Sequence, residues 1–149
     1  MKTQISSPQQ ADLDLWPIGN CQVSGLIDES SGLVWGCVPR VDGDPVFCAL
    51  LNGDNRDSGV WRFELDGQVK SEQHYIRNTA MLVTRLEAED GSAVEITDFC
   101  PRFERSGRMY RPVAYARIVR PVFTTSSTRT TTLSSTDDGI SVRRSGGRS

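Results

Sequence analysis

Short apolar runs, separated by turn residues, recur between residues 15 and 122 of the chain. Val94 and Ile96, for example, alternate with Glu95 and Thr97, and this period of two residues is typical of a half-buried antiparallel strand. In this part of the chain, no window sustains the 3.6-residue period of a long amphipathic helix. The pattern therefore predicts an all-β fold, a partial antiparallel β-sandwich of about seven short strands.

Turn sequences divide these runs into hairpins. Two Asp-Gly pairs, Asp66-Gly67 and Asp90-Gly91, each separate two strand-like runs, which is a strong hairpin signal. A third hairpin is expected to join residues 23–28 to residues 32–38.

One short helix is also predicted. Asp44 has the side chain of a helix cap, and Pro45 fits the first position of a helix. We therefore expect a turn or two of helix within Val46–Leu51.

The composition changes near the end of the chain. Residues 124–149 contain 14 Ser or Thr and only three large apolar residues, Leu133, Ile140 and Val142. Such a segment buries too little apolar surface to offset the entropy lost on ordering. We expect three regions: a flexible N-terminus at 1–12, a sandwich domain at 13–122, and a disordered Ser/Thr-rich tail at 123–149.

Charge narrows the range of partners. The chain has 17 Lys or Arg against 19 Asp or Glu, a net charge of -2, and residues 1–123 alone carry -4. A general nucleic-acid binder needs a basic surface, so we expect no nucleic acid as partner. No apolar run reaches the length of a membrane span, and residues 1–15 lack the apolar core of a secretory signal. We expect no membrane contact and a cytoplasmic location.

Cysteine and histidine do not form a metal motif. Cys21, Cys37, Cys48 and Cys100 form no C-x-x-C pair, and His74 is the single histidine. We therefore expect no metal and no cofactor. Cys37 and Cys48 lie in apolar strings and are expected to be buried, and His74 is expected on a half-exposed strand rather than in a catalytic triad.

One cluster in the sequence suggests a sugar-binding surface. Trp35, Arg40 and Asp42 bring an aromatic ring, a guanidinium and a carboxylate to the end of a predicted strand. Tryptophan rings stack on sugar rings, and Arg and Asp side chains bond hydroxyl groups. The alternative is structural: a tryptophan of the core, and an arginine that pairs with a turn aspartate.

Four segments resemble, in order, the start of bacterial glycoside hydrolase family 15 proteins, the glucoamylase- and trehalase-like enzymes. They contain an I-G-N opening, a W-G-C-V-P-R-V-D segment, a Y-I-R-N-T segment and an I-T-D-F-C-P segment, at residues 15–21, 32–47, 75–79 and 94–102. The resemblance covers about residues 13–122. Val41 stands where the family often has an aromatic residue.

The resemblance implies an amino-terminal β-sandwich that precedes a linker and a catalytic (α/α)6 barrel. In such enzymes the barrel carries two glutamates for inverting hydrolysis of α-glucosidic bonds, and its substrate is an α-glucan or a disaccharide. Neither glutamate has a matching position in this sequence. After residues 120–122 the family pattern stops, which indicates truncation before the barrel, by a frameshift or in a true short variant.

The first interpretation is therefore an accessory domain that packs on a barrel and is inactive alone. A stand-alone carbohydrate-binding or interaction sandwich is the alternative, as is a non-functional frameshifted fragment. We also expect self-association, because a truncated sandwich leaves a sheet edge unpaired and an apolar patch exposed.

Overall fold

The structure is a computed structural model that describes residues 13–52, 58–122, 131–136 and 139–144. The elements, in chain order, are β1 (Trp16–Gly19), β2 (Ser24–Ile27), β3 (Leu33–Val38), β4 (Asp44–Cys48), the 3-10 helix η1 (Ala49–Leu51), β5 (Phe63–Leu65), β6 (Gln68–Tyr75), β7 (Leu82–Ala88), β8 (Ala93–Phe99), β9 (Phe103–Arg105), β10 (Arg108–Tyr110), β11 (Ala116–Val122), β12 (Thr131–Thr136) and β13 (Gly139–Arg144).

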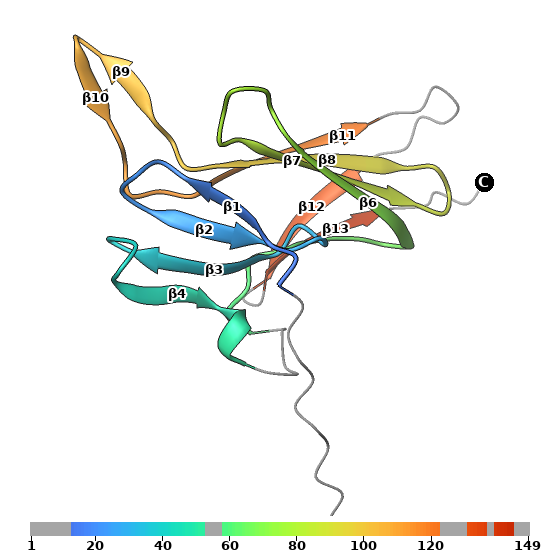
Figure 1. Cartoon of the computed structure of the whole chain (residues 1–149). Helices are drawn as coiled ribbons and strands as arrows, with labels where there is room; N and C mark the ends of the chain where they lie inside the picture. Colours follow the sequence, from blue (N-terminus) through green and yellow to red (C-terminus); the bar gives the residue numbers. More distant parts are fainter. Residues whose placement is uncertain (1–12, 53–57, 123–130, 137–138, 145–149) are drawn as a thin grey trace, which may run out of the picture.

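Two four-stranded antiparallel sheets form the body of the protein (Figure 1). One sheet has the order β1-β2-β3-β4, and the other has the order β11-β8-β7-β6. The predicted all-β, sandwich-like architecture is confirmed. β9 and β10 form a separate hairpin, and the expected hairpins β2–β3 and β7–β8 are both present.

Both sheets contribute to a shared core. One cluster of buried side chains comprises Ile18, Val23, Ile27, Leu33, Leu82 and Cys100. A second cluster comprises Phe63, Leu86, Val94 and Ile96. Burying one side chain of this size contributes about 1.5–3 kcal/mol, so these residues hold the two sheets together.

The predicted helix within Val46–Leu51 is wrong over most of its length. Residues up to Cys48 belong to β4, where Phe47 lies opposite Gly36, and only Ala49–Leu51 form a 3-10 turn. As part of β4, these residues form backbone hydrogen bonds with β3, whereas a helix this short would be only marginally stable in water. Among the described residues, no helix is long and apolar enough to cross a membrane.

The Asp66-Gly67 pair does not form the predicted hairpin. β5 has only three residues and pairs with β13, while β6 pairs with β7 along its full length. The Gly67 carbonyl accepts a 3.0 Å hydrogen bond from the Glu89 backbone N–H, beyond the end of β7. After this turn, β6 does not pair with β5. It pairs with β7, because β7 offers a longer ladder than the three residues of β5.

Within the Ser/Thr-rich tail, the structure describes two strands. β12 and β13 form an antiparallel pair, and β13 lies parallel to β5. Threonine is β-branched and favours strands. Residues 1–12, 123–130, 137–138 and 145–149 lie outside the described residues. The flexible N-terminus, the 13–122 domain boundary and the disorder of the tail therefore stay predictions.

A buried ion pair crosses the interior of the sandwich. Asp98 of β8 and Arg117 of β11 lie opposite each other, with side chains 0% and 1% exposed. Arg117 donates from Nε and Nη2 to the two carboxylate oxygens, at 2.6 and 3.0 Å. Burial raises the pKa of Asp98, and these two hydrogen bonds oppose the shift.

Arg117 also bonds the opposite side of the core. Its remaining donors reach the backbone carbonyls of Ser31 and Trp61. The guanidinium carbon lies 5.2 Å from the ring centre of Trp61 and 4.8 Å from that of Phe63, which are cation–π distances. One side chain thus joins the β8–β11 pair to the β2–β3 turn and to the segment before β5.

Tyr115 forms a second polar connection between the sheets. Its hydroxyl lies 2.9 Å from the Ser24 carbonyl oxygen and 3.0 Å from that of Cys37. Gly36 leaves the space for this ring, because a Cβ there would lie 2.9 Å from the tyrosine oxygen. Burial raises the pKa of Tyr115 to about 12.

Removing the carboxylate of the buried ion pair is expected to destabilise the fold strongly. Asp98→Ala leaves the Arg117 guanidinium buried without a counter-charge, which costs about 3–5 kcal/mol of unfolding free energy. Urea titration followed by circular dichroism measures the change. Glu95→Ala, on the outer face of the same strand, is the control and is expected to change stability by about 0.5 kcal/mol or less. Equal losses in the two variants would contradict this role.

Tyr115 makes stability fall at alkaline pH. The unfolded tyrosine ionises near its ordinary value, whereas the folded one keeps its proton to about pH 12, so unfolding becomes easier as pH rises between these values. Tyr115→Phe is expected to be less stable near neutral pH by about 0.5–1.5 kcal/mol and to lose this part of the pH dependence. Thermal unfolding over an alkaline pH series tests both, with the exposed Tyr110→Phe as control. A wild-type slope that persists in Tyr115→Phe would refute the assignment.

Candidate functional site

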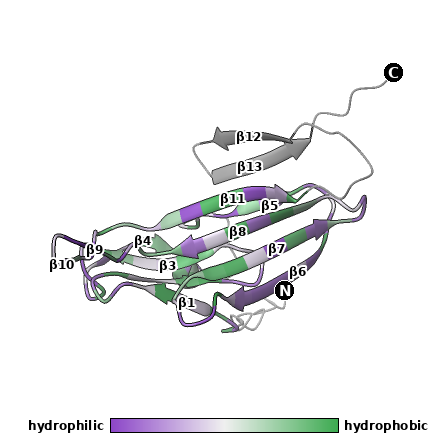
Figure 2. Cartoon of the chain, turned by 90° about the horizontal axis from the view of Figure 1, so that it is seen from above, coloured by the Kyte–Doolittle hydropathy of each residue, from purple (hydrophilic) through white to green (hydrophobic). Residues whose placement is uncertain are grey.

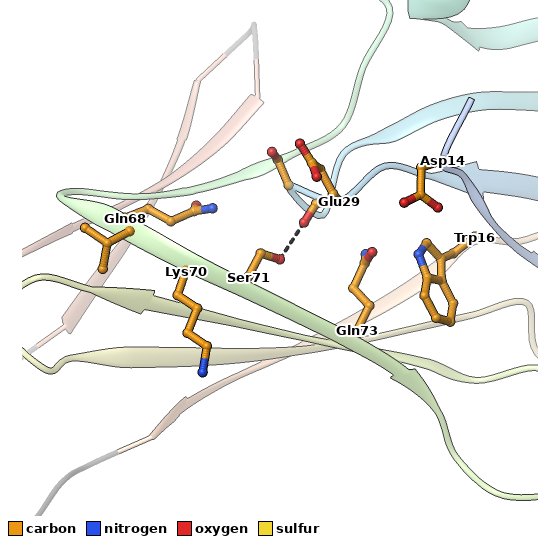
Figure 3. Close-up of a pocket in the computed structure, with 9 residues that line it drawn as sticks. Asp14, Trp16, Glu29, Gln68, Lys70, Ser71 and Gln73 are labelled. Atoms are coloured by element: carbon orange, nitrogen blue, oxygen red, sulfur yellow. Dashed lines mark hydrogen bonds between the residues drawn. The ribbon is translucent and has the colours of Figure 1, made fainter. Parts of the chain in front are cut away.

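A polar cleft opens where β6 lies beside the start of β1 and the β2–β3 turn (Figure 3). Its volume is about 430 Å³. The residues that line it include Trp16, Asp14, Glu29, Gln68 and Gln73. The cleft therefore combines one aromatic surface with several groups that bond hydroxyls.

Hydrogen bonds fix the wall that carries Glu29. Asp28 accepts the backbone N–H groups of Ser30 and Gly32 at 3.0 and 2.6 Å, which holds the turn in shape. Ser71 Oγ donates to the Glu29 carbonyl oxygen at 2.5 Å, and Gln73 Nε2 donates to that of Asp28 at 2.8 Å. The turn is thus tied to β6 at two points, and Glu29 itself is exposed.

Packing holds the aromatic wall in place. The Trp16 ring centre lies 5.3 Å from that of Tyr75, at an interplanar angle of 50°. Tyr75 donates its hydroxyl to the Pro17 carbonyl oxygen at 2.7 Å, and burial raises the pKa of this tyrosine. The indole is therefore preorganised, with part of its surface lining the cleft.

Lys70 borders the cleft, but its ammonium group points away from Glu29 (Figure 3). It pairs instead with Glu72 at 2.7 Å. The bond raises the pKa of Lys70 and lowers the pKa of Glu72, because each charge stabilises the other. The charged groups presented to the cleft are therefore carboxylates, which accept hydrogen bonds from hydroxyl or cationic donors.

The structure separates the site residues predicted from the sequence into two places. Arg40 and Asp42 form an exposed bidentate pair in the β3–β4 turn, with N–O distances of 2.9 and 3.0 Å. Trp35 lies within β3, opposite Leu26 on β2 and Cys48 on β4. Arg40 and Asp42 thus satisfy each other, as the structural alternative stated, and sugar binding at this surface stays a prediction.

His74 and the cysteines lie apart from the cleft lining. His74 is exposed on β6, Cys37 and Cys100 are buried, Cys48 is partly buried, and Cys21 is exposed. Burial raises the pKa of Cys100 to about 11. In the described part of the chain, no group of three His, Cys, Asp or Glu side chains could hold a metal ion.

Polar residues of the resemblance segments make structural bonds. Asn20, which is 2% exposed, donates its amide to the carbonyl oxygens of Pro101 and Pro112 at 2.8 and 2.9 Å. Its side-chain oxygen accepts the backbone N–H groups of Gln22 and Val23. Tyr75 and Asp98, from the third and fourth segments, bond Pro17 and Arg117 as described. Polar contacts therefore join the first segment to the third and the fourth.

The outer faces of the two sheets each carry a cross-strand row of side chains, and these two rows differ in chemistry. Glu72, Arg85, Glu95 and Arg120 lie opposite one another across the β6-β7-β8-β11 sheet, so charges of opposite sign alternate over all four strands. Val94 and Ile96 flank Glu95 and point to the core, which places this charged row on the outside. Figure 2 shows the hydrophilic character of β6. Such a face is stable in water.

The other sheet carries an apolar row. Pro17, Leu26, Trp35 and Cys48 lie opposite one another across its four strands. The next pair along the β2–β3 ladder, Ile27 and Leu33, belongs to the core. The register shifts between this pair and the pair of Leu26 and Trp35, and because of this shift Trp35 points outward. We call these four residues the apolar row.

Sequence reasoning missed the cleft because its walls come from distant segments. Trp16, Glu29 and Gln73 meet only when β6 lies beside β1 and the β2–β3 turn. Asp98 did give a signal: it occupies the position after Val94 and Ile96 in the two-residue alternation, so its side chain faces the core and needs a partner.

Comparison with known proteins gives no match: no family model, no curated protein and no solved structure is similar to this chain. The chemistry of its surfaces is therefore the basis for a functional proposal.

Proposed function

We propose that this chain is an accessory β-sandwich of a glucoamylase- or trehalase-like α-glucosidase, as the family 15 resemblance implies. The observation that carries the proposal is the contrast between the two cross-strand rows, one on each outer face. One face has a row of alternating charges, and the other has the apolar row of Pro17, Leu26, Trp35 and Cys48. This contrast is typical of a domain that packs on a partner through one side.

Free energy favours the apolar row as the contact. Covering it removes apolar surface from water and gains about 25 cal/mol per Å². Covering the charged row would instead desolvate Glu72, Arg85, Glu95 and Arg120, and imperfect pairing there would cost several kcal/mol. Trp35, first considered as a sugar ligand, has in this proposal the role of a central anchor, a common role of tryptophan in interfaces.

The accessory role is scaffolding rather than hydrolysis. Asp98, the buried carboxylate of the fourth resemblance segment, is held by Arg117 and has no access to a substrate. The partner that supports the proposal is the (α/α)6 barrel of the resemblance. The chain would stabilise that barrel and border its entrance without taking part in bond cleavage.

Binding to an isolated family 15 barrel tests the proposal. Wild-type chain is expected to bind the barrel and raise its melting temperature, whereas Trp35→Glu is expected to weaken binding by more than about tenfold, since it places a charge in the apolar contact. Thr97→Glu adds the same charge to the outer face of the other sheet and should bind like wild type. The chain alone should release no glucose from trehalose, maltose or soluble starch. Glucose release, absent binding, or equal loss in both variants would overturn the proposal.

The cleft favours a second candidate, a carbohydrate-binding module. Trp16 offers an apolar ring surface. Glu29 offers a carboxylate beside it, and Gln73 offers its side-chain oxygen, since its Nε2 already donates to Asp28 and Thr84. This combination suits a neutral sugar, whose ring has apolar C–H faces and a polar rim.

Calorimetry with maltose and trehalose tests this candidate at the cleft. Glu29→Gln is expected to weaken binding about tenfold, because a hydrogen bond to a charged group contributes about 1.5–3 kcal/mol. Asp42→Asn makes the same chemical change at the β3–β4 turn and should leave affinity unchanged. If Asp42→Asn alone weakens binding, the sugar surface lies at Trp35, Arg40 and Asp42 instead. No heat with either sugar would reject both locations.

A further inference from the structure

The β9–β10 hairpin lies in the longest run of exposed residues within 13–52 and 58–122. It extends from the body of the sandwich (Figure 1), and every residue from Arg102 to Val113 is exposed. Three large apolar side chains on it are open to solvent: Phe103 at 47%, Met109 at 48% and Tyr110 at 42%. A two-stranded hairpin alone is only marginally stable in water, so a covering partner would stabilise it.

One face of the hairpin combines aromatic and cationic groups. Phe103 lies opposite Tyr110, with ring centres 5.5 Å apart and an interplanar angle of 14°. Arg105 lies opposite Arg108, and the two-residue period of a strand places all four side chains on the same face. The turn between the arginines, Ser106-Gly107, has positive φ at both residues, as tight hairpin turns do.

The arginine pair is unfavourable as it stands. Like charges directly opposite on paired strands repel, and within the described residues neither Arg105 nor Arg108 forms an ion pair. A carboxylate placed between the two guanidinium groups would turn this repulsion into two charge-assisted contacts. This face of the hairpin therefore favours a ligand that places a negatively charged group between Arg105 and Arg108.

We propose that this hairpin face binds a carboxylate-bearing segment of a partner protein. The carboxylates would lie between Arg105 and Arg108, and an apolar side chain of the segment would cover the Phe103–Tyr110 stack. Tyrosine and arginine are the residue types that most often dominate the energy of protein interfaces. The inference is independent of the accessory role, since it uses neither the apolar row nor the cleft.

Charge distribution favours an acidic protein over a nucleic acid. Residues 102–111 carry four Arg and one Glu, but residues 1–123 as a whole carry -4. A long polyphosphate would meet the acidic body as well as the hairpin, whereas a short acidic segment meets only the hairpin. A nucleic acid is therefore the competing outcome of the test.

The test measures binding of a fluorescent peptide of alternating Glu and Leu, about twelve residues long, which matches the strand period of the hairpin. Fluorescence anisotropy with the full chain is expected to show binding that weakens with added salt. Arg105→Glu combined with Arg108→Glu is expected to weaken binding by at least about tenfold. Tyr110→Ser provides a second, uncharged variant that is expected to weaken binding by removing half of the aromatic stack.

Matched controls decide between the outcomes. Lys70→Glu combined with Arg120→Glu makes the same change in net charge on the outer face of the β6–β11 sheet and should leave binding intact. A Lys-Leu peptide of equal length should not bind. The proposal fails if the Glu-Leu peptide does not bind wild type, if both charge-reversed proteins lose binding equally, or if oligouridylate of equal length binds more tightly than the peptide.

Discussion

The buried contact between Asp98 and Arg117 is the constraint on which the rest of the sandwich depends. A guanidinium in the interior is tolerated only when its donors are bonded, and here it bonds a carboxylate on β8 and two backbone carbonyls across the core. Its acceptors lie on three different parts of the chain. The strands of β8 and β11, the β2–β3 turn and the segment before β5 must therefore all be in place together.

This requirement explains the position of the cleft. Arg117 holds the Ser31 carbonyl, so the β2–β3 turn is anchored from inside the core at its far end. Ser71 and Gln73 hold the same turn from the side of β6. Glu29 lies between these anchors, and its exposed carboxylate is consequently presented by a fixed loop rather than a mobile one.

Local sequence patterns predicted those elements whose partners are adjacent in the chain. The alternation around Val94 and Ile96 and the Asp90-Gly91 turn were sufficient for the β7–β8 hairpin. The same kind of turn failed at Asp66-Gly67, because the choice of partner for β6 depends on β7, which comes later in the chain. The sequence pattern did not predict the β9–β10 hairpin, because charged residues interrupt the alternation of apolar and polar positions in its strands. Its turn, Ser106-Gly107, has positive φ at both residues. Pairings between distant segments, such as Trp16 with Tyr75, depend on the whole topology.

Three polar side chains, Asn20, Tyr75 and Asp98, serve the fold. The side chain of Asn20 forms hydrogen bonds with four backbone groups. Tyr75 donates a hydrogen bond to the Pro17 carbonyl, and Asp98 accepts one from Arg117. Groups that are fully bonded inside a protein have no remaining capacity for a ligand. These bonds hold the body together, and interaction with other molecules must come from surfaces outside them. Those surfaces are the apolar row, the cleft at Glu29 and the arginine face of the β9–β10 hairpin. None of the residues that define them takes part in the Asp98–Arg117 contact, so each surface can be altered without removing that contact.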